Sequence, residues 1–447
     1  MAGQMIQDKA SEMAAKQTIP AGYKQTEVGV IPEDWKVRSI GELAIVRDGT
    51  HQTPKYQSCG VPFYSVEHVT SGDFENTKFI SEQEHKYLTR SFKIEKGDVL
   101  MTRIGSIGEC KLIDWDVEAS FYVSLALLKI RDASAEYIVQ YSNSLAFKKE
   151  LELNSLQHAT PKKINLGPIS NIKISVPSSL SEQRSIARTL RDLDVLITKL
   201  DELITKKQAI KTATMQQLLT GRTRLPQFAR RPDGTPKGHK SSELGQIPED
   251  WKVVCLGDIG QSLIGLTYSP KDVSDDGVLV LRSSNVQNGR LAYEDTVFVQ
   301  MDLPDRVMVK EGDILICVRN GSRQLIGKCA LIDKSAQGFA FGAFMSVYRT
   351  EAHGFVFYQF QSDIIQSQIN ETMGATINQI TNRDMARFKI MMPKSIEEQT
   401  AIATILTDMD SELTALEQKL AKARDVKQGM MQQLLTGRIR LPLSKEA

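Results

Sequence analysis

The chain has 447 residues, of which 41% are hydrophobic and 25% are charged, and its formal net charge is +2. This composition is that of an ordinary globular protein and excludes a disordered chain. No apolar run reaches the roughly 18 to 20 residues of a membrane span and the first residues lack a secretory signal, so we expect a cytoplasmic protein.

Two phrases occur twice, and they define how the chain is organised. GVIPEDWKV starts at Gly29 and GQIPEDWKV at Gly245, while MQQLLTGRTRLP starts at Met215 and MQQLLTGRIRLP at Met431, so both pairs are 216 residues apart. A solenoid repeat has a period of roughly 20 to 50 residues, whereas a domain has about 100 to 200. The sequence therefore predicts two tandem copies of one unit with pseudo-twofold symmetry.

Each copy opens with a domain, predicted over residues 21–177 and 245–393, and residues 1–20 form an N-terminal extension to which we assign no function. The segments that the copies share, such as KGDVLMTRIGSIGECKLI from Lys96, read as strands and turns. The segments that differ are polar loops, such as RDGTHQTPKY from Arg47 against LIGLTYSPKDV from Leu263. One scaffold with two sets of loops fits a molecule that reads two different short signals.

A long helix follows each domain, predicted over residues 178–221 and 394–437. Each helix begins with the Ser-x-x-Glu spacing of a capping box, Ser179–Glu182 and Ser395–Glu398, and a glycine follows its last turn. Apolar residues recur at alternating steps of four and three, the spacing of a coiled-coil seam. Each apolar stripe has only the other to cover it, so we predict that the helices pair, antiparallel if a twofold axis relates the copies. The seam residues are Ile186, Leu190, Leu193, Ile197, Leu200, Ile204, Ile402, Leu406, Met409, Leu413, Leu416 and Leu420.

A basic linker over residues 222–244 joins the copies, and residues 438–447 form a C-terminal tail. Between Gly221 and Lys240 there are six lysines and arginines against one acid, Asp233. Such a segment either contacts DNA phosphates or is a solvated tether, and the second interpretation is slightly favoured.

These features resemble the specificity subunit of type I restriction–modification systems, over nearly the whole chain. The motifs are the doubled IPEDWKV, the P..(S/I).EQ..IA helix openings at Pro177 and Pro393, QQLLTGR, and DGTH.TPKY in the first domain. The resemblance implies an α+β fold, with two mixed α/β target recognition domains in pseudo-twofold tandem repeat and a long antiparallel two-helix coiled coil between them. It implies that each domain reads one half of an interrupted, asymmetric DNA site, and that the helices set the gap between the halves.

The same resemblance implies partners and cofactors. The partners are double-stranded DNA and two modification (methyltransferase) subunits, and the presence of two restriction (translocase and nuclease) subunits stays open. S-adenosylmethionine is expected on the modification subunit and ATP with Mg on the restriction subunit, while this chain binds no cofactor. The near-identical helix ends beyond the seam predict a docking surface for the modification subunits. Its residues are Leu218, Leu219, Leu434 and Leu435.

We expect a non-catalytic subunit. The sequence has no GxxxxGK(S/T) phosphate-binding loop and neither NPPY nor DPPY, the base-pocket signature of adenine methyltransferases. The six histidines lack metal-ligand spacing and the five cysteines lack CxxC spacing, so we expect no metal site. The alternative is a coiled-coil scaffold that presents two protein-binding domains without DNA recognition, and an enzyme in its own right is a third interpretation.

Base edges in the major groove are read by Arg or Lys at guanine, by Asn or Gln at adenine, and by Ser or Thr at several bases. Candidates in the first domain are His51, Gln52, Thr53, Lys55, Tyr56, Glu67, His68, Arg103, Ser106, Lys162 and Lys163. Candidates in the second domain are Thr267, Tyr268, Lys271, Arg282, Ser283, Asn285, Arg319, Asn320, Ser322 and Arg323. Arg103 and Arg319 share a repeat position, which predicts a common role such as a phosphate contact or support of the Gly-Ser loop. Trp35 and Trp251 belong to the constant frame and are predicted to anchor each domain against the helices.

Overall fold

The structure is a computed structural model that describes residues 19–156, 159–373 and 378–442, so nearly all of the N-terminal extension lies outside the described residues. Contacts divide the chain into two compact units, unit 1 with residues 1–201 and 419–447, and unit 2 with residues 202–418. Each unit therefore contains one domain together with a part of each long helix. The units are described separately below.

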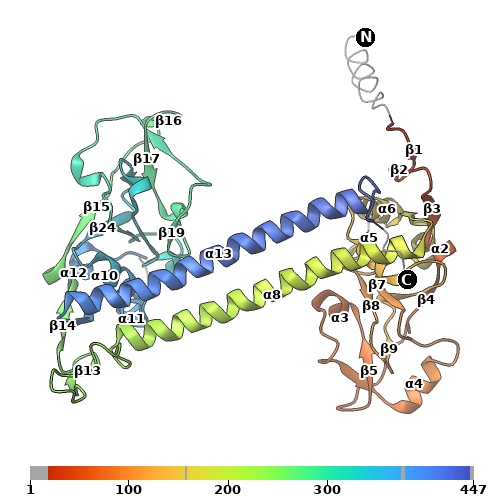
Figure 1. Cartoon of the computed structure of the whole chain (residues 1–447), viewed down its shortest axis with the longest axis horizontal. Coiled ribbons are helices and arrows are strands. Elements are labelled where there is room, and N and C mark those ends of the chain that lie inside the picture. Colours follow the sequence, from red (N-terminus) through yellow and green to blue (C-terminus); the bar gives the residue numbers. More distant parts are fainter. Residues whose placement is uncertain (1–18, 157–158, 374–377, 443–447) are drawn as a thin grey trace, which may run out of the picture. The chain divides into compact units, whose positions relative to one another are not determined.

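The first domain, in unit 1, combines two sheets with short helices (Figure 1). A four-stranded antiparallel sheet has the order β4-β10-β7-β8, and a smaller sheet has the order β6-β5-β9, in which β5 and β9 are parallel. The strands are β1 (Tyr23–Thr26), β2 (Gly29–Pro32), β3 (Lys36–Ser39), β4 (Ala44–Asp48), β5 (Val61–Tyr64), β6 (Lys78–Ile80), β7 (Val99–Thr102), β8 (Cys110–Leu112), β9 (Ser120–Phe121), β10 (Leu125–Ile130) and β11 (Lys173–Val176). The helices are α2 (Ile40–Leu43), α3 (Val66–Ser71), α4 (Glu82–Leu88), α5 (Ala135–Ser142), α6 (Leu145–Asn154) and α7 (Leu166–Asn171).

The second domain, in unit 2, repeats this plan with more irregular connections. Its four-stranded antiparallel sheet has the order β15-β24-β21-β22, and its second sheet has the order β16-β20-β17-β23. The strands are β12 (His239–Ser242), β13 (Gly245–Pro248), β14 (Trp251–Cys255), β15 (Gln261–Ile264), β16 (Val273–Ser274), β17 (Val278–Leu281), β18 (Val286–Gln287), β19 (Arg290–Leu291), β20 (Phe298–Val299), β21 (Ile314–Cys317), β22 (Cys329–Leu331), β23 (Ala340–Phe341), β24 (Met345–Arg349) and β25 (Lys389–Pro393). The helices are α9 (Leu256–Ile259), α10 (His353–Phe360), α11 (Asp363–Thr372) and α12 (Asn382–Arg387), with 3-10 turns η1 (Ser283–Asn285), η2 (Asp305–Val307), η3 (Arg323–Leu325) and η4 (Lys334–Ala336).

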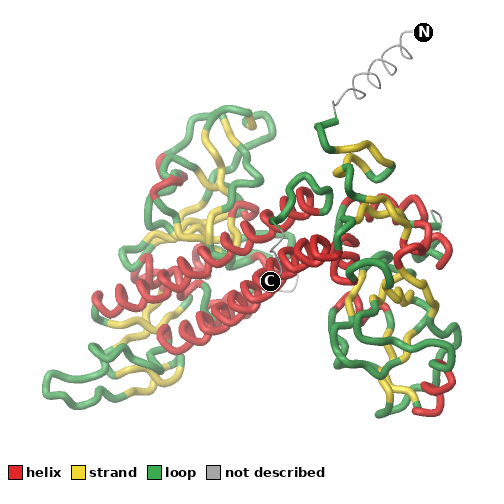
Figure 2. Tube along the Cα trace, turned by 45° about the vertical axis from the view of Figure 1, so that its right-hand side comes forward, coloured by secondary structure: helices red, strands yellow, loops and turns green. Residues whose placement is uncertain are grey.

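Each domain is closed by a two-stranded sheet made of its first and last segments. Strand β3 pairs with β11 in the first domain and β14 pairs with β25 in the second, both antiparallel. The chain therefore enters and leaves each domain at one place, beside the start of the long helix. Figure 2 shows the strands, in yellow, gathered in the domains, and the long helices, in red, as continuous segments.

The long helices are α8 (Leu180–Leu219) and α13 (Ile396–Leu434), each about 60 Å long at 1.5 Å per residue. They run antiparallel within both units. In unit 1, Lys427 Nζ lies 2.5 Å from an Asp194 carboxylate oxygen, and Arg424 pairs with Asp201. In unit 2, Lys207 pairs with Glu412 at 2.7 Å and Lys211 with Asp410 at 2.5 Å. Among the described residues, no helix combines the length and the apolar content that crossing a membrane requires.

The predicted seam follows the enclosed face of both helices. All twelve seam residues are buried or half-buried in the structure, and none is exposed. Near the domains the seam packs on more than the other helix: Ile186 and Leu190 join the core of the first domain, and Ile402 and Leu406 join that of the second. The stripe therefore fixes each domain to the helices as well as pairing the helices.

The helix ends differ in one respect from the prediction. Ser179 and Ser395 accept the expected hydrogen bonds from the backbone N–H groups of Glu182 and Glu398. The reciprocal half of the capping box is not formed, because both glutamate side chains turn to arginines. At the other end of each helix, Gly221 and Gly437 have a φ of +68°, which favours glycine. Each also packs against the proline of the IPEDWKV motif in the same unit, so a side chain at either glycine would clash.

Candidate nucleic-acid interface and helix anchors

In the first domain three polar segments converge at the strand ends. The backbone N–H of Thr50 donates to Phe121, and that of Val123 donates to Thr50, which holds the THQTPKY loop against the β9–β10 connection. The N–H of Gly105, in the Gly-Ser loop, donates to the carbonyl of Lys162 at 2.8 Å. Candidates that the structure leaves exposed are His51, Gln52, Thr53, Lys55, Tyr56, Glu67, Ser106 and Lys162, and Lys163 is half-buried. These residues stay predictions.

Two candidates of the first domain are enclosed. His68 is 3% exposed, accepts a hydrogen bond from the Ser65 N–H through Nδ1 at 2.9 Å, and packs against Tyr64. Arg103 is 4% exposed, and its guanidinium forms an ion pair with Asp48 and donates to the carbonyl of Ile164. The prediction that His68 and Arg103 contact DNA is wrong, because neither side chain reaches the surface.

The loops of the second domain also converge. The N–H of Leu266 donates to Phe341, the Asn320 side chain donates to Ser283 Oγ at 3.1 Å, and the Asn378 side chain donates to the carbonyl of Gly321. Exposed candidates are Thr267, Lys271, Arg319, Ser322 and Arg323, and half-buried candidates are Tyr268, Arg282, Ser283 and Asn320.

Asn285 corrects a further prediction. Its side chain is fully buried, its oxygen accepts from the Arg282 N–H, and its nitrogen donates to the carbonyls of Ala292 and Asp295. An amide with both ends satisfied inside the domain does not read a base, so Asn285 is a structural residue. The Arg282 side chain already has a partner within the domain, because it forms an ion pair with Asp295 at 2.7 Å.

Arg103 and Arg319 do not occupy equivalent positions in the structure, because strand register aligns Arg103 with Val318 and Arg319 with Ile104. Arg103 is locked inside the first domain, whereas Arg319 is exposed and its guanidinium carbon lies 5.2 Å from the centroid of the Phe344 ring. The expectation of a common function for the two arginines is wrong.

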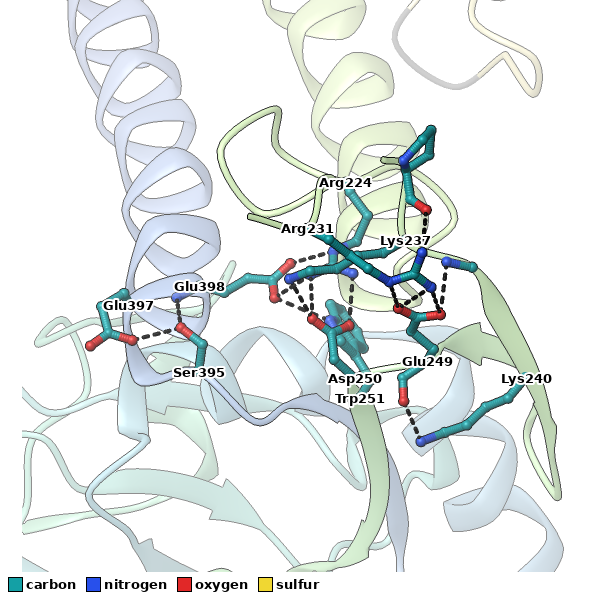
Figure 3. A network of polar contacts seen from close by, with 12 residues as sticks. Arg224, Arg231, Lys237, Lys240, Glu249, Asp250, Trp251, Ser395, Glu397 and Glu398 are labelled. Carbon is teal, nitrogen blue, oxygen red and sulfur yellow. Dashed lines mark hydrogen bonds and ion pairs between the residues drawn. The ribbon is translucent and has the colours of Figure 1, made fainter. Parts of the chain in front are cut away.

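An arginine joins helix and domain in unit 2 (Figure 3). Arg224 donates to both carboxylate oxygens of Glu398, at 2.6 and 2.7 Å, and to Asp250 at 2.9 and 3.3 Å. The indole N–H of Trp251 donates to Glu398 at 3.2 Å. Burial opposes ionisation of Asp250, but hydrogen bonds from Arg224 and Lys237 outweigh it and lower the pKa of Asp250. We call these four residues, Arg224, Asp250, Trp251 and Glu398, the unit 2 anchor.

Unit 1 contains the corresponding anchor, formed by Arg440, Asp34, Trp35 and Glu182, but the buried indole N–H of Trp35 has no hydrogen-bond partner among the described residues. Arg440 donates to Glu182 at 2.5 and 2.8 Å and to Asp34 at 2.9 Å through two nitrogens. The hydrogen bond from Arg440 lowers the pKa of Asp34. Both tryptophans are fully buried, which confirms their predicted role as anchors. Bidentate arginine–carboxylate pairs fix orientation as well as supplying energy.

The structure also argues against the interpretation that the basic linker contacts DNA phosphates. Arg224 belongs to the anchor, Arg231 pairs with Glu249 at 2.7 Å, and Lys237 pairs with Asp250 at 2.8 Å (Figure 3). Lys240 donates to the backbone carbonyl of Glu249. Most of the positive charge of the linker is therefore neutralised by the PED carboxylates or held against their backbone.

A second contact joins both helices to the domain in each unit. In unit 2, the Tyr358 hydroxyl donates at 2.8 Å to Asp410, the residue that pairs with Lys211. In unit 1 the Gln140 side chain donates to Asp194, the residue that pairs with Lys427. Each domain is thus tied to the helix pair at two points.

The four leucines predicted as a docking surface are inside the protein. Leu218, Leu219, Leu434 and Leu435 are between 1% and 5% exposed and belong to the cores of the units. Sequence identity between the helix ends here reflects packing against the same frame. The prediction that these leucines present a partner surface is wrong.

The outer side of the same helix ends lines a groove in each unit. The groove of unit 2 has a volume of about 560 Å³ and lies between α8, α13, α11 and the residues Asn288 and Arg290. The groove of unit 1 has a volume of about 530 Å³ and lies between α13 and the turn that joins α5 to α6. Matching residues line both grooves: Met215 and Met431, Gln216 and Gln432, Leu219 and Leu435, Thr220 and Thr436, Arg222 and Arg438, Ser362 and Ser144. We call them the twin grooves. Leu219 and Leu435 contribute only to their lining.

Comparison with known proteins agrees with this architecture. The family described as "Type I restriction modification DNA specificity domain" matches residues 32–212 and 248–423. The chain is 27% identical over 434 residues to the putative type I restriction enzyme MjaX specificity subunit of Methanocaldococcus jannaschii, covering 94% of this chain and 97% of that protein. It is 26% identical over 425 residues to the MjaVIII specificity subunit of the same organism, covering 92% and 94%.

A solved structure supports the fold. The type I restriction–modification system S subunit from M. genitalium superposes with a TM-score of 0.59 at 16% identity, covering 90% of this chain and 96% of that chain. Two domains with one scaffold and different loops, each anchored to a pair of antiparallel helices, define a class of paired recognition modules. The chain belongs to the type I restriction–modification DNA specificity family.

Proposed function

We propose that this protein is the DNA-specificity subunit of a type I restriction–modification complex, in which each domain reads one half of an interrupted, asymmetric site. The observation that carries the proposal is the contrast between frame and loops. The two domains share their sheets, closing strands and anchors, whereas the exposed side chains that converge at the strand ends differ, with THQTPKY in one and Thr267, Arg319 and Ser322 in the other. Proteins read sequence with such side chains presented from a rigid scaffold.

The chain itself is proposed to be non-catalytic. Two modification subunits bring S-adenosylmethionine and the methyl-transfer chemistry, and restriction subunits bring ATP and Mg²⁺. We propose that the length of the long helices sets the gap between the half-sites.

The twin grooves are proposed as the docking sites for two copies of the modification subunit. Six positions of their lining match in the two units although the neighbouring domains differ, which suits two copies of one partner. Arg222 and Arg438 are exposed at the groove edges, and neither forms an ion pair with a residue in the described ranges. We therefore expect the bound segment to carry a carboxylate next to an apolar side chain.

Filling one groove tests the docking proposal. Thr220→Arg places a long side chain in the unit 2 groove, and Thr436→Arg does so in unit 1, so each single variant should bind one modification subunit and the double variant none. Ala213→Arg, on an exposed part of α8 outside the groove, is the control and should bind two. Native mass spectrometry gives the stoichiometry. Two subunits bound to the double variant would overturn the assignment of the grooves.

Selection from random DNA tests the function. The complex with its modification partner is incubated with a pool of random duplexes, and bound fragments are sequenced. We expect enrichment of one interrupted motif. Stable assembly without enrichment at any salt concentration would instead support the scaffold with two protein-binding domains, because a purely electrostatic contact carries no sequence preference.

A further inference from the structure

The second domain exposes two large apolar side chains next to an arginine. Phe344 is 56% exposed and Ile264 is 62% exposed. The Arg319 guanidinium lies over the Phe344 ring, at 5.2 Å from its centroid, and no carboxylate of the described residues forms an ion pair with it. Single apolar residues on a protein surface are ordinary. An exposed aromatic ring that orients an unpaired guanidinium, however, is typical of a surface that binds a partner.

The backbone around this pair is rigid. The N–H groups of Val318 and Arg319 both donate to the Phe344 carbonyl, at 3.0 and 3.1 Å, and the N–H of Ile380 donates to the carbonyl of Val318 at 2.9 Å. Arg319 and Phe344 are therefore presented by two neighbouring segments whose relative position is fixed by hydrogen bonds.

The first domain has the same backbone frame. There the N–H of Arg103 donates to Ser124 at 2.9 Å, and the N–H of Ile164 donates to Arg103 at 3.0 Å. Ser124 thus takes the place of Phe344, and Arg103 takes the place of Val318, whose N–H and carbonyl make the corresponding hydrogen bonds. Arg319 takes the place of Ile104, because Ile104 bridges to Lys163 and Arg319 bridges to Gln379. The first domain therefore has no arginine at the position of Arg319.

Strand register shows what else differs at these positions. Asp48, the last residue of β4, pairs with Ala126 of β10, and Ile264, the last residue of β15, pairs with Ser346 of β24. The Asp48 carboxylate binds Arg103 and holds it inside. In the second domain Ile264 and Val318 stand where Asp48 and Arg103 stand in the first, so apolar side chains replace both charges, and the exposed Arg319 comes one position later.

We infer that Arg319 and Phe344 form a base-reading pair that exists in the second domain only, an inference that rests on the proposed function. Arg319 donates to O6 and N7 of a guanine in the second half-site, and Phe344 makes apolar contact with the neighbouring base. The planar guanidinium matches the guanine edge, and phenylalanine is suited to the thymine methyl group. Stacking on the ring restricts the arginine before DNA arrives, which reduces the entropy lost on binding.

The test compares two variants in complex with the modification partner. Arg319→Gln and Phe344→Ser replace exposed side chains. Lys252→Gln removes one exposed charge from the constant frame of the same unit and is the matched control. Each complex selects its motif from random duplexes, and its affinity for the wild-type motif is measured by fluorescence anisotropy.

We expect Arg319→Gln to lose the preference at one G·C pair of the second half-site and Phe344→Ser to relax the adjacent position. Each should lower affinity for the wild-type motif roughly 5- to 150-fold, the range for one specific base contact. The first half-site should be unchanged in both, and Lys252→Gln should match wild type.

Three results would overturn the inference while leaving the proposed function intact. One is an unchanged second half-site and affinity in Arg319→Gln and Phe344→Ser. Another is uniform weakening on all sequences with a smaller salt dependence, which identifies a phosphate contact. The third is loss of the modification partner, which assigns the pair to a protein interface. If wild type enriches no motif, the proposed function fails and the inference fails with it.

Discussion

At the residue scale, ion pairs and buried leucines hold each unit together. Arg224 and Arg440 each bind two carboxylates, one from the start of the domain and one from the start of the helix of the same unit. The Arg224–Glu398 pair is buried, with side chains 8% and 2% exposed, whereas the Arg440 and Asp34 side chains are 41% and 57% exposed. A buried pair that loses one member leaves an uncompensated charge, which costs about 3 to 5 kcal/mol in known cases. The unit 2 anchor is therefore more sensitive to single substitutions than the unit 1 anchor, where solvent screens the charges.

The Asp250 carboxylate gives a pH-dependent prediction. Its pKa in the folded protein is lowered from 3.8, so its contribution to stability is present above that value and is lost as the pH falls toward the lower folded pKa. Asp250→Asn should be less stable than wild type at pH 7, and the difference in unfolding midpoint in urea should shrink below pH 3.8. Asp275→Asn, at an exposed position, is the control. A difference that stays constant with pH would contradict this account.

The leucines of MQQLLTGR give a second prediction. Leu219 is 1% exposed in the core of unit 2, so Leu219→Ala should lower the free energy of unfolding by about 2 to 5 kcal/mol. Gln217, two residues earlier and exposed, should tolerate alanine within about 0.5 kcal/mol. Denaturant unfolding of both variants checks this. Equal stability of L219A and wild type would mean that these leucines are available to a partner after all.

At the element scale, the sequence predicted more of the helices than of the loops. The a/d stripe and the flanking proline and glycine located α8 and α13 to within a few residues, because period and caps are local signals. Whether a loop side chain points outward is not local: aligning the Gly-Ser loops by sequence matches Arg103 with Arg319, whereas strand register matches Arg103 with Val318 and Arg319 with Ile104. The anchors could have been predicted from the sequence, because Arg224 and Arg440 recur at the same position of the constant frame, and so do the acidic residues that they bind.

The helices also give a prediction about spacing. Inserting four residues after Thr205 in α8 and four after Leu416 in α13 lengthens the pair by about one turn, roughly 6 Å, with little disturbance of the seam. At 3.4 Å per base pair the recognised gap should grow by about one or two pairs, with both half-sequences retained. Four residues inserted after Asp233, in an exposed turn of the linker, should leave the gap unchanged. Methylation mapping on plasmid DNA reads the gap, and an assembled helix variant that keeps the original spacing would show that the helices do not set it.

At the scale of the whole molecule, the central claim is that one chain carries two independent readers on one frame. The closing sheets β3–β11 and β14–β25 bring both ends of each domain together, and each unit has its own core, anchor and groove. A domain attached in this way can be exchanged without rebuilding the helices. In this account the repeated frame binds two identical partners, and the loops, which are not repeated, bind different DNA sequences.

Exchange of one domain tests this claim most directly. Residues 38–173, which run from the middle of β3 to the first residue of β11, are replaced by the corresponding segment of another family member, and the complex with the modification partner selects from random duplexes. We predict a motif with a new first half, the original second half and the original gap. A motif in which both halves change, or in which neither does, would contradict the account.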